Sequence, residues 1–209
     1  MENLLRTIIN QLRIKRRLFR DLSNRSVIND LDDWIKPYLS GIEREASLDL
    51  GCGVNPKNPF CADMVYGVDF IENLDKQIVV ADLTIEAIPH PDGQFDFVTA
   101  FDFIEHIPRI VYAPQKRFPF VELMDEIWRV LKPGGLFLSH TPIYPFVEAF
   151  QDPTHVNIIT SNTLRDYFCG ESRIAKMYGF RGVFNLEAEA LKGSHLVSIL
   201  RKSTLTNQP

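Results

Sequence analysis

The sequence has few cysteines, and their spacing excludes several classes of protein. Cys52, Cys61 and Cys169 are odd in number and form no CxxC pair, so neither a disulfide scaffold nor a cysteine-rich zinc site is indicated. No apolar run reaches the roughly 18 residues that a membrane span requires, and the N-terminus lacks a signal-peptide pattern. We therefore expect a protein of the reducing cytoplasm without a transmembrane segment.

Basic residues are scarce outside one short segment. The 209 residues include 23 Lys and Arg against 27 Asp and Glu, a net charge of −4, so nucleic acid is not expected as a partner. Residues 1–25 are the exception, because seven of them are basic and two are acidic. Apolar residues recur at helical spacing over 2–22, which predicts a basic amphipathic helix. Its apolar face could pack on the domain, or the helix could make peripheral contact with an anionic membrane.

Short apolar runs alternate with longer segments from residue 46 onward. They cover 47–50, 65–68, 78–80, 95–100 and 136–139. Such alternation is typical of a parallel sheet with crossover connections. Residues 183–190 and 195–201 predict a hairpin with Gly193 in its turn. The predicted fold is α/β, a Rossmann-like, doubly wound, mostly parallel seven-stranded sheet with an antiparallel C-terminal hairpin.

Two further helices and a division of the chain follow from local signals. One helix is expected from Ile28 to Leu39, with Asn29 or Asp30 as its cap. The other covers 121–131 and ends at the Lys-Pro-Gly-Gly segment 132–135, because proline cannot continue a helix and glycine accepts the left-handed turn. We expect an N-terminal helical extension over 1–45 and the main domain over 46–205.

A glycine turn and two acidic strand ends indicate a ligand. Gly51 and Gly53 follow the first strand, where a doubly wound sheet receives ligands, and the missing Cβ lets backbone approach a ligand closely. Pro56 replaces the third glycine of the dinucleotide fingerprint. Asp69 is suitably placed for ribose hydroxyls and Asp82 for an adenine amino group. The three strand ends together outline an adenosyl amino acid.

The order of these motifs resembles the class I S-adenosylmethionine-dependent methyltransferases, in their small-molecule branch. The matching segments are LDLGCG (48–53), GVD (67–69), ADL (81–83), FDFVTAFDFIEHIPR (95–109) and LMDEIWRVLKPGGLFLSHTP (123–142). The resemblance implies S-adenosylmethionine as cofactor and assigns it these neighbours: Asp49, Gly51, Cys52, Gly53, Asp69, Phe70, Asp82, Leu83 and Phe101. The chain departs from the family at 54–59, where two prolines replace a helix.

Candidate catalytic residues lie after the fourth and fifth strands. Asp102, Glu105 and His106 have i, i+3, i+4 spacing, which places them on one face if the segment is helical. The motif is similar to one in ubiquinone-pathway O-methyltransferases, in which a divalent metal has been implicated. Local hydrogen bonding explains the same residues, and we assign no metal ligand.

A second candidate is the segment 151–155. Asp152 could orient His155 as a general base, although an Asp-Pro turn with a satisfied histidine is the alternative. Nearby aromatic residues could line an acceptor pocket, stack on a sugar, or belong to the core. These are Tyr144, Phe146 and Phe150, with His140 beside them.

The sequence thus predicts an S-adenosylmethionine-dependent O-methyltransferase for a small hydroxylated acceptor, such as a sugar or a surface-polysaccharide precursor. His155, His106 and Asp102 are the predicted catalytic residues. Two alternatives belong to other classes: an NAD-linked oxidoreductase, and a non-catalytic cofactor-binding subunit that activates a partner. A bound divalent metal and a homodimer are left open.

Overall fold

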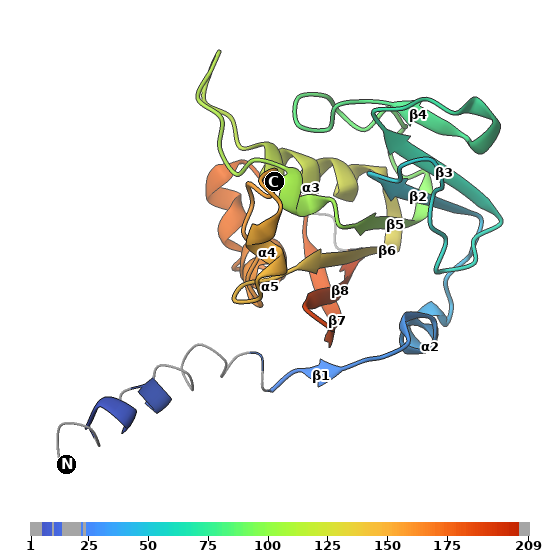
Figure 1. Cartoon of the computed structure of the whole chain (residues 1–209). Coiled ribbons are helices and arrows are strands. Elements are labelled where there is room, and N and C mark those ends of the chain that lie inside the picture. The colour runs from blue at the N-terminus through green and yellow to red at the C-terminus, as the bar shows by residue number, and fades with distance from the viewer. Residues whose placement is uncertain (1–5, 10, 14–21, 23, 205–209) are drawn as a thin grey trace.

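A single mixed sheet organises the chain. The computed structural model describes residues 6–9, 11–13, 22 and 24–204, and in it the strand order is β1-β7-β8-β6-β5-β2-β3-β4 (Figure 1). The strands are β1 (Ser26–Val27), β2 (Ala46–Leu50), β3 (Met64–Asp69), β4 (Ile78–Val80), β5 (Phe95–Phe101), β6 (Leu131–Pro142), β7 (Phe184–Lys192) and β8 (His195–Lys202).

The strand pairing confirms the predicted fold and adds one strand. β4, β3, β2, β5 and β6 are mutually parallel, whereas β8 runs antiparallel to both β6 and β7. Gly193 has a φ of 63° in the hairpin turn, as a left-handed turn position requires. The two-residue β1, an eighth strand that was not predicted, pairs in parallel with β7 at the edge.

Helices are short except for α3. The helical segments are α2 (Leu31–Ile35), η1 (Lys36–Leu39), η2 (Leu74–Lys76), η3 (Ile104–His106), α3 (Pro119–Val130), α4 (Glu148–Gln151), α5 (Thr163–Phe168) and η4 (Ile174–Tyr178). The predicted helix over 28–39 is realised as α2 and η1, and Asp30 is its N-cap, accepting from the Asp33 amide at 3.0 Å. Pro37 lies in the first turn of η1, where its missing N–H costs nothing.

The N-terminal segment joins the main sheet before residue 46. Residues 6–9, 11–13 and 22 are helical, while the rest of the predicted helix over 2–22 lies outside the described residues. Leu22 is buried in the main core, and Arg25 pairs with Glu189 of β7, whose side chain is 2% exposed. The described residues 22 and 24–45 of the expected extension therefore include a strand of the sheet and residues that pack against it. None of the helices that the structure describes is long and apolar enough to cross a membrane.

Each face of the sheet has its own core. One cluster joins the sheet to α3 and α5, and the other joins it to α2 and η1, so helices cover opposite sides (Figure 1). The described residues 51–63 contain no helix, as the prolines predict. Phe60 of this connection is fully buried and stacks on Phe97 of β5 at 4.3 Å between ring centroids. Its side chain thus packs on the face of the sheet on which a helix in this connection would pack.

Candidate functional site

A cavity of about 410 Å³ lies at the carboxyl ends of β2, β3 and β4. Leu50 pairs with Val68, and Asp69 with Val80, so the residues that follow these parallel strands reach one edge of the sheet. The structure thereby brings together several residues that the sequence predicted for the cofactor, and His106 with them. The lining comprises Gly51, Val68, Asp69, Phe70, Ala81, Asp82, Leu83, Thr84, Phe103, His106, Ile107 and Thr154.

Gly51 forms the floor of the turn after β2. Its φ is 65°, a region that residues with a Cβ rarely adopt, and its amide donates to the Val68 carbonyl at 2.9 Å. A Cβ at this position would overlap the ring of Phe103. Glycine is therefore required at residue 51 both by the backbone angle and by the close approach of Phe103, which sequence reasoning did not identify.

Asp69 links the glycine turn to the second strand end. One carboxylate oxygen accepts from the Gly53 amide at 2.8 Å and the other from the Phe70 amide at 2.7 Å. A carboxylate offers about four acceptor sites, so capacity for two further donors is left. Asp82 similarly accepts from the Thr84 amide at 2.9 Å and retains a second oxygen. Both side chains can accept hydrogen bonds from a ligand in the cavity without giving up their own partners.

Four of the predicted cofactor neighbours do not line this cavity: Asp49, Cys52, Gly53 and Phe101. The Gly53 amide donates to the Asp69 carboxylate instead. Asp49 is 1% exposed and accepts from the Thr99 hydroxyl at 2.6 Å and the Lys57 amide at 2.8 Å. Burial raises its pKa to about 6. The described contacts therefore give Asp49 the role of holding the loop over residues 51–57.

The other two side chains face neighbouring strands and loops. Cys52 packs so closely on Gly67 that a Cβ there would overlap its sulfur, and burial raises the pKa of its thiol to about 12. Phe101 lies under the Lys57 ammonium, 4.4 Å from nitrogen to ring centroid.

His106 lies at the cavity wall with a chain of polar partners behind it. The Thr154 hydroxyl lies 3.0 Å from His106 Nδ1 and donates to Asp152 at 2.6 Å. The expected contact of the Asp152 carboxylate with the His155 ring does not form: Asp152 accepts from Thr154, and Nδ1 of His155 is buried without a hydrogen-bond partner. The Asp-Pro turn therefore positions His106, through Thr154.

The expected single face of Asp102, Glu105 and His106 is also absent. Residues 104–106 form only a short 3-10 turn, η3, and Asp102 precedes it with a φ of 52°, so its side chain leaves in another direction. Glu105 is 2% exposed, accepts from the Thr141 hydroxyl at 2.8 Å and lies with His106 and His155. Burial raises the pKa of Glu105.

Asp102 instead meets two histidines from other strands. One carboxylate oxygen lies 3.2 Å from His140 Nδ1 and 3.1 Å from His195 Nε2, and the pKa of Asp102 is lowered by its hydrogen bonds to these rings. The two imidazoles stack at 4.4 Å. His195 was missed in the sequence, because the predicted hairpin pairs β8 with β7 only, and the structure shows that the start of β8 also lies beside the end of β6. His140 thus stacks on His195 and not on the aromatic residues near it in sequence. The rings of Tyr144 and Phe150 lie edge to face, with 6.2 Å between their centroids.

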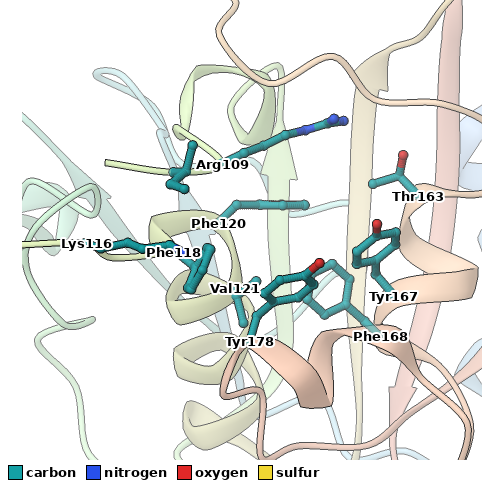
Figure 2. A pocket seen from close by; sticks show the side chains of 10 residues that line it. Arg109, Lys116, Phe118, Phe120, Val121, Thr163, Tyr167, Phe168 and Tyr178 are labelled. Carbon is teal, nitrogen blue, oxygen red and sulfur yellow. The ribbon is translucent and has the colours of Figure 1, made fainter. Parts of the chain in front are cut away.

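A second cavity, of about 430 Å³, lies beyond the loop that carries His106, because Arg109 and Ile110 of that loop line it. Figure 2 shows aromatic rings from α3, α5 and η4 gathered around it, with Arg109 extending along one side. Arg109 donates to Asn157 at 2.6 Å, and Asn157 donates to the Glu105 carbonyl at 2.9 Å, so this wall is joined to the His106 turn. The lining comprises Arg109, Ile110, Lys116, Phe118, Phe120, Val121, Thr163, Tyr167, Phe168 and Tyr178.

The sheet order and the acidic strand ends agree with the resemblance to class I S-adenosylmethionine-dependent methyltransferases. Residues 48–139, which are less than half of the chain, match the family model described as a methyltransferase domain, so this part of the chain is similar to that family. A putative methyltransferase from Bacillus halodurans superposes with a TM-score of 0.54 at 16% identity, covering 83% of this chain and 99% of that one. The 4+2 cyclase SpnF reaches 0.56 at 15% identity, covering 91% and 94%. These likenesses show the fold.

Two curated relatives are similar in sequence. A sterol 24-C-methyltransferase from Pneumocystis carinii is 27% identical over an alignment 181 positions long, which covers 77% of this chain and 44% of the relative. A 24-methylenesterol C-methyltransferase 2 from Oryza sativa is 27% identical over an alignment 163 positions long, which covers 67% of this chain and 42% of the relative. The chain thus spans less than half the length of the curated relatives it matches.

Proposed function

We propose that this chain transfers the methyl group of S-adenosylmethionine to a hydroxyl of a small acceptor, such as a sugar or a surface-polysaccharide precursor. The observation that carries the proposal is the single cavity that joins Gly51, Asp69, Asp82 and His106. It combines a close backbone approach, acceptors for ribose and adenine, and a titratable side chain.

The cavity fits the cofactor in size and in chemistry. Its volume of about 410 Å³ lies within the roughly 300–1,000 Å³ of small-molecule sites. Asp69 and Asp82 would hold the ribose and the adenine through their remaining acceptor sites, while Leu83 and Phe103 supply apolar surface beside them. When bound, S-adenosylmethionine supplies a methyl group on a sulfonium, which leaves as a neutral thioether.

His106 is the proposed general base, and its hydrogen bonds fix the proton. Thr154 has one hydroxyl proton, and it donates this proton in a hydrogen bond to Asp152, because an ionised carboxylate can only accept. The hydrogen bonds from Thr154 also lower the pKa of Asp152. Thr154 must then accept from Nδ1–H of His106. The neutral ring therefore carries its free electron pair on Nε2, which can take the acceptor's hydroxyl proton as the new oxygen–carbon bond forms.

The second cavity is the proposed site for the rest of the acceptor. Its aromatic rings suit stacking on a sugar face, and the Tyr167 and Tyr178 hydroxyls add hydrogen-bonding groups. Arg109 and Lys116 give it positive charge, which favours an acceptor that carries a phosphate or carboxylate. Because 106 and 107 line the first cavity and 109 and 110 the second, one loop would contact both ligands.

Two measurements test the proposal against its competitors. Parallel calorimetric titrations with S-adenosylhomocysteine and NAD should give saturable binding of the first alone; preferential binding of NAD would favour an oxidoreductase. Incubation with methyl-labelled cofactor and a panel of sugar phosphates, nucleotide sugars and sterols should label a hydroxylated, anionic compound. Labelling of a sterol carbon would replace the proposed acceptor, and tight cofactor binding with turnover only alongside a partner protein would favour the activating-subunit alternative.

A further inference from the structure

Asp102, His140 and His195 form a compact cluster at the carboxyl edge of the sheet, separate from the proposed base. Asp102 follows β5, His140 lies near the end of β6, and His195 begins β8. One potential ligand atom from each lies within 4.8 Å of the others. We propose that these three side chains bind a divalent transition-metal ion, a function that does not depend on methyl transfer.

The separations match those of neighbouring ligands on one ion. Two donors at bond lengths of about 2.1 Å lie about 3 to 3.5 Å apart when bound side by side. The Asp102 oxygen is 3.2 Å from His140 Nδ1 and 3.1 Å from His195 Nε2. The two rings are stacked nearly parallel, with 15° between their planes, and an imidazole binds a metal ion that lies in the plane of the ring. At least one ring would therefore turn about its side-chain torsions to bring all three donors onto an ion, while the strands stay in place.

The surroundings of the cluster favour ligation in two further ways. Ser194 Oγ lies 3.2 Å from Nδ1 of His195, the ring nitrogen that would not bind the ion, and such a partner fixes ring orientation in metal sites. Asp102 has a side chain that is 54% exposed, whereas those of His140 and His195 are 15% and 24% exposed. The ion would be held firmly from within and keep open positions toward solvent.

The donor set selects the kind of ion. Two imidazoles and one carboxylate, with open positions, suit Mn²⁺, Fe²⁺, Co²⁺ or Zn²⁺, whereas Mg²⁺ and Ca²⁺ prefer all-oxygen sites. One carboxylate charge between two neutral rings leaves a net positive site after the ion binds. Because Asp102 precedes Phe103, which lines the cofactor cavity, the ion would lie beside that cavity and could attract an anionic or hydroxylated acceptor.

The test is a Co²⁺ titration of the full chain after treatment with a chelator, followed by visible absorption and calorimetry. Wild type should bind one ion with the spectrum of nitrogen and oxygen ligation. The double variant H140A/H195A should show no saturable binding by Co²⁺. Ser194→Ala should weaken binding by about tenfold, as for other groups behind a ligand. The matched control is H106A/H155A, which removes two histidines from the neighbouring cluster with Glu105 and should bind Co²⁺ as wild type does.

Three results would overturn the proposal. Wild type that binds no Co²⁺ would leave the cluster as a hydrogen-bonded group only. Unchanged binding in H140A/H195A, or loss of binding in H106A/H155A alone, would place the ion elsewhere. If H140A/H195A does not fold, Asp102→Asn and the paramagnetic broadening of the His140 and His195 ring signals in wild type by Co²⁺ answer the same question. None of these readouts requires methyl transfer, so failure of this proposal and failure of the proposed function are distinguishable.

Discussion

Thr154 lies between Asp152 and His106, donating its hydroxyl proton to the first at 2.6 Å and facing Nδ1 of the second at 3.0 Å. Thr154→Val keeps the shape of the side chain and removes both hydrogen bonds. His106 should then lose its fixed tautomer, and the turnover number should fall about tenfold. This is less than the roughly 10²–10⁴-fold that a general base usually contributes, because the variant removes the fixed tautomer and not the base itself. Nitrogen NMR of the His106 ring reports the tautomer directly, and the labelled-cofactor assay reports turnover.

Thr160→Val is the control for this prediction. Thr160 lies in the same connection, but its hydroxyl contacts Thr163 and is not at the cofactor cavity. It should leave the His106 ring signals unchanged. Because Thr163 lines the second cavity, any effect on catalysis should be on the KM for the acceptor and not on the turnover number. Equal loss in both variants would mean that Thr154 acts on the fold of the connection and not on the histidine.

Asp69→Asn should weaken cofactor binding. The amide retains one acceptor oxygen but loses the charge and half of the acceptor sites, and a hydrogen bond to a charged group contributes about 1.5–3 kcal/mol. We expect the Kd for S-adenosylhomocysteine to rise at least about tenfold, measured by calorimetry. Asp75→Asn removes an exposed carboxylate from η2 on the same flank and should not change Kd. A similar Kd for wild type and Asp69→Asn would remove Asp69 from the cofactor site.

Gly51→Ala should cost more stability than Gly193→Ala. Both glycines have nearly the same φ, 65° and 63°, so the left-handed backbone penalty of about 1–2 kcal/mol is common to both. Only at residue 51 does the added Cβ also meet a ring, that of Phe103, whereas no atom lies within 4 Å at residue 193. Urea unfolding should show the difference. The double variant G51A/F103A should recover part of it relative to Phe103→Ala alone, and equal costs for the two alanines would contradict the close contact.

Much of the site follows from the order of the parallel strands. Because such strands end at one edge, Gly51, Asp69 and Asp82 could be placed together before any coordinates were known. The direction in which a side chain leaves its strand end could not. Asp102 adopts a φ of 52° and turns to His140, and Thr154 links Asp152 to His106; both depend on loop conformations that sequence spacing does not encode.

Asp49 illustrates the same limit within a regular strand. The family resemblance placed it beside the cofactor, yet its side chain is buried and accepts from Thr99 and Lys57. The resemblance named Asp49 from its residue type and its place in the motif. The register of β2 against β5 places Asp49 opposite Thr99, and this shows why the Thr99 hydroxyl occupies one of its oxygens. The hydrogen-bond partner of a strand residue therefore follows from the pairing of two strands and not from a motif within one of them.

The buried carboxylate of Asp49 predicts a pH-dependent cost to the fold. Burial raises its pKa from 3.8 to about 6, so the folded state binds the proton more tightly than the unfolded state. The contribution of Asp49 to the free energy of unfolding is therefore fully favourable below pH 3.8 and is lost as the pH rises through about 6. This difference in pKa corresponds to a change of about 3 kcal/mol in the free energy of unfolding between low pH and pH values well above 6.

The neutral variant Asp49→Asn isolates this effect. Urea unfolding at intervals from about pH 4.5 to 7 should show wild type losing stability relative to Asp49→Asn as the pH rises, with little further change above pH 7 because the carboxyl is then ionised in both states. Asp63→Asn, at an exposed position of the same connection, should keep a constant difference from wild type. A pH-independent difference for Asp49→Asn would mean that the bonds from Thr99 and Lys57 fully offset burial, and that the loop carrying Gly51 is held by an ordinary ionised carboxylate.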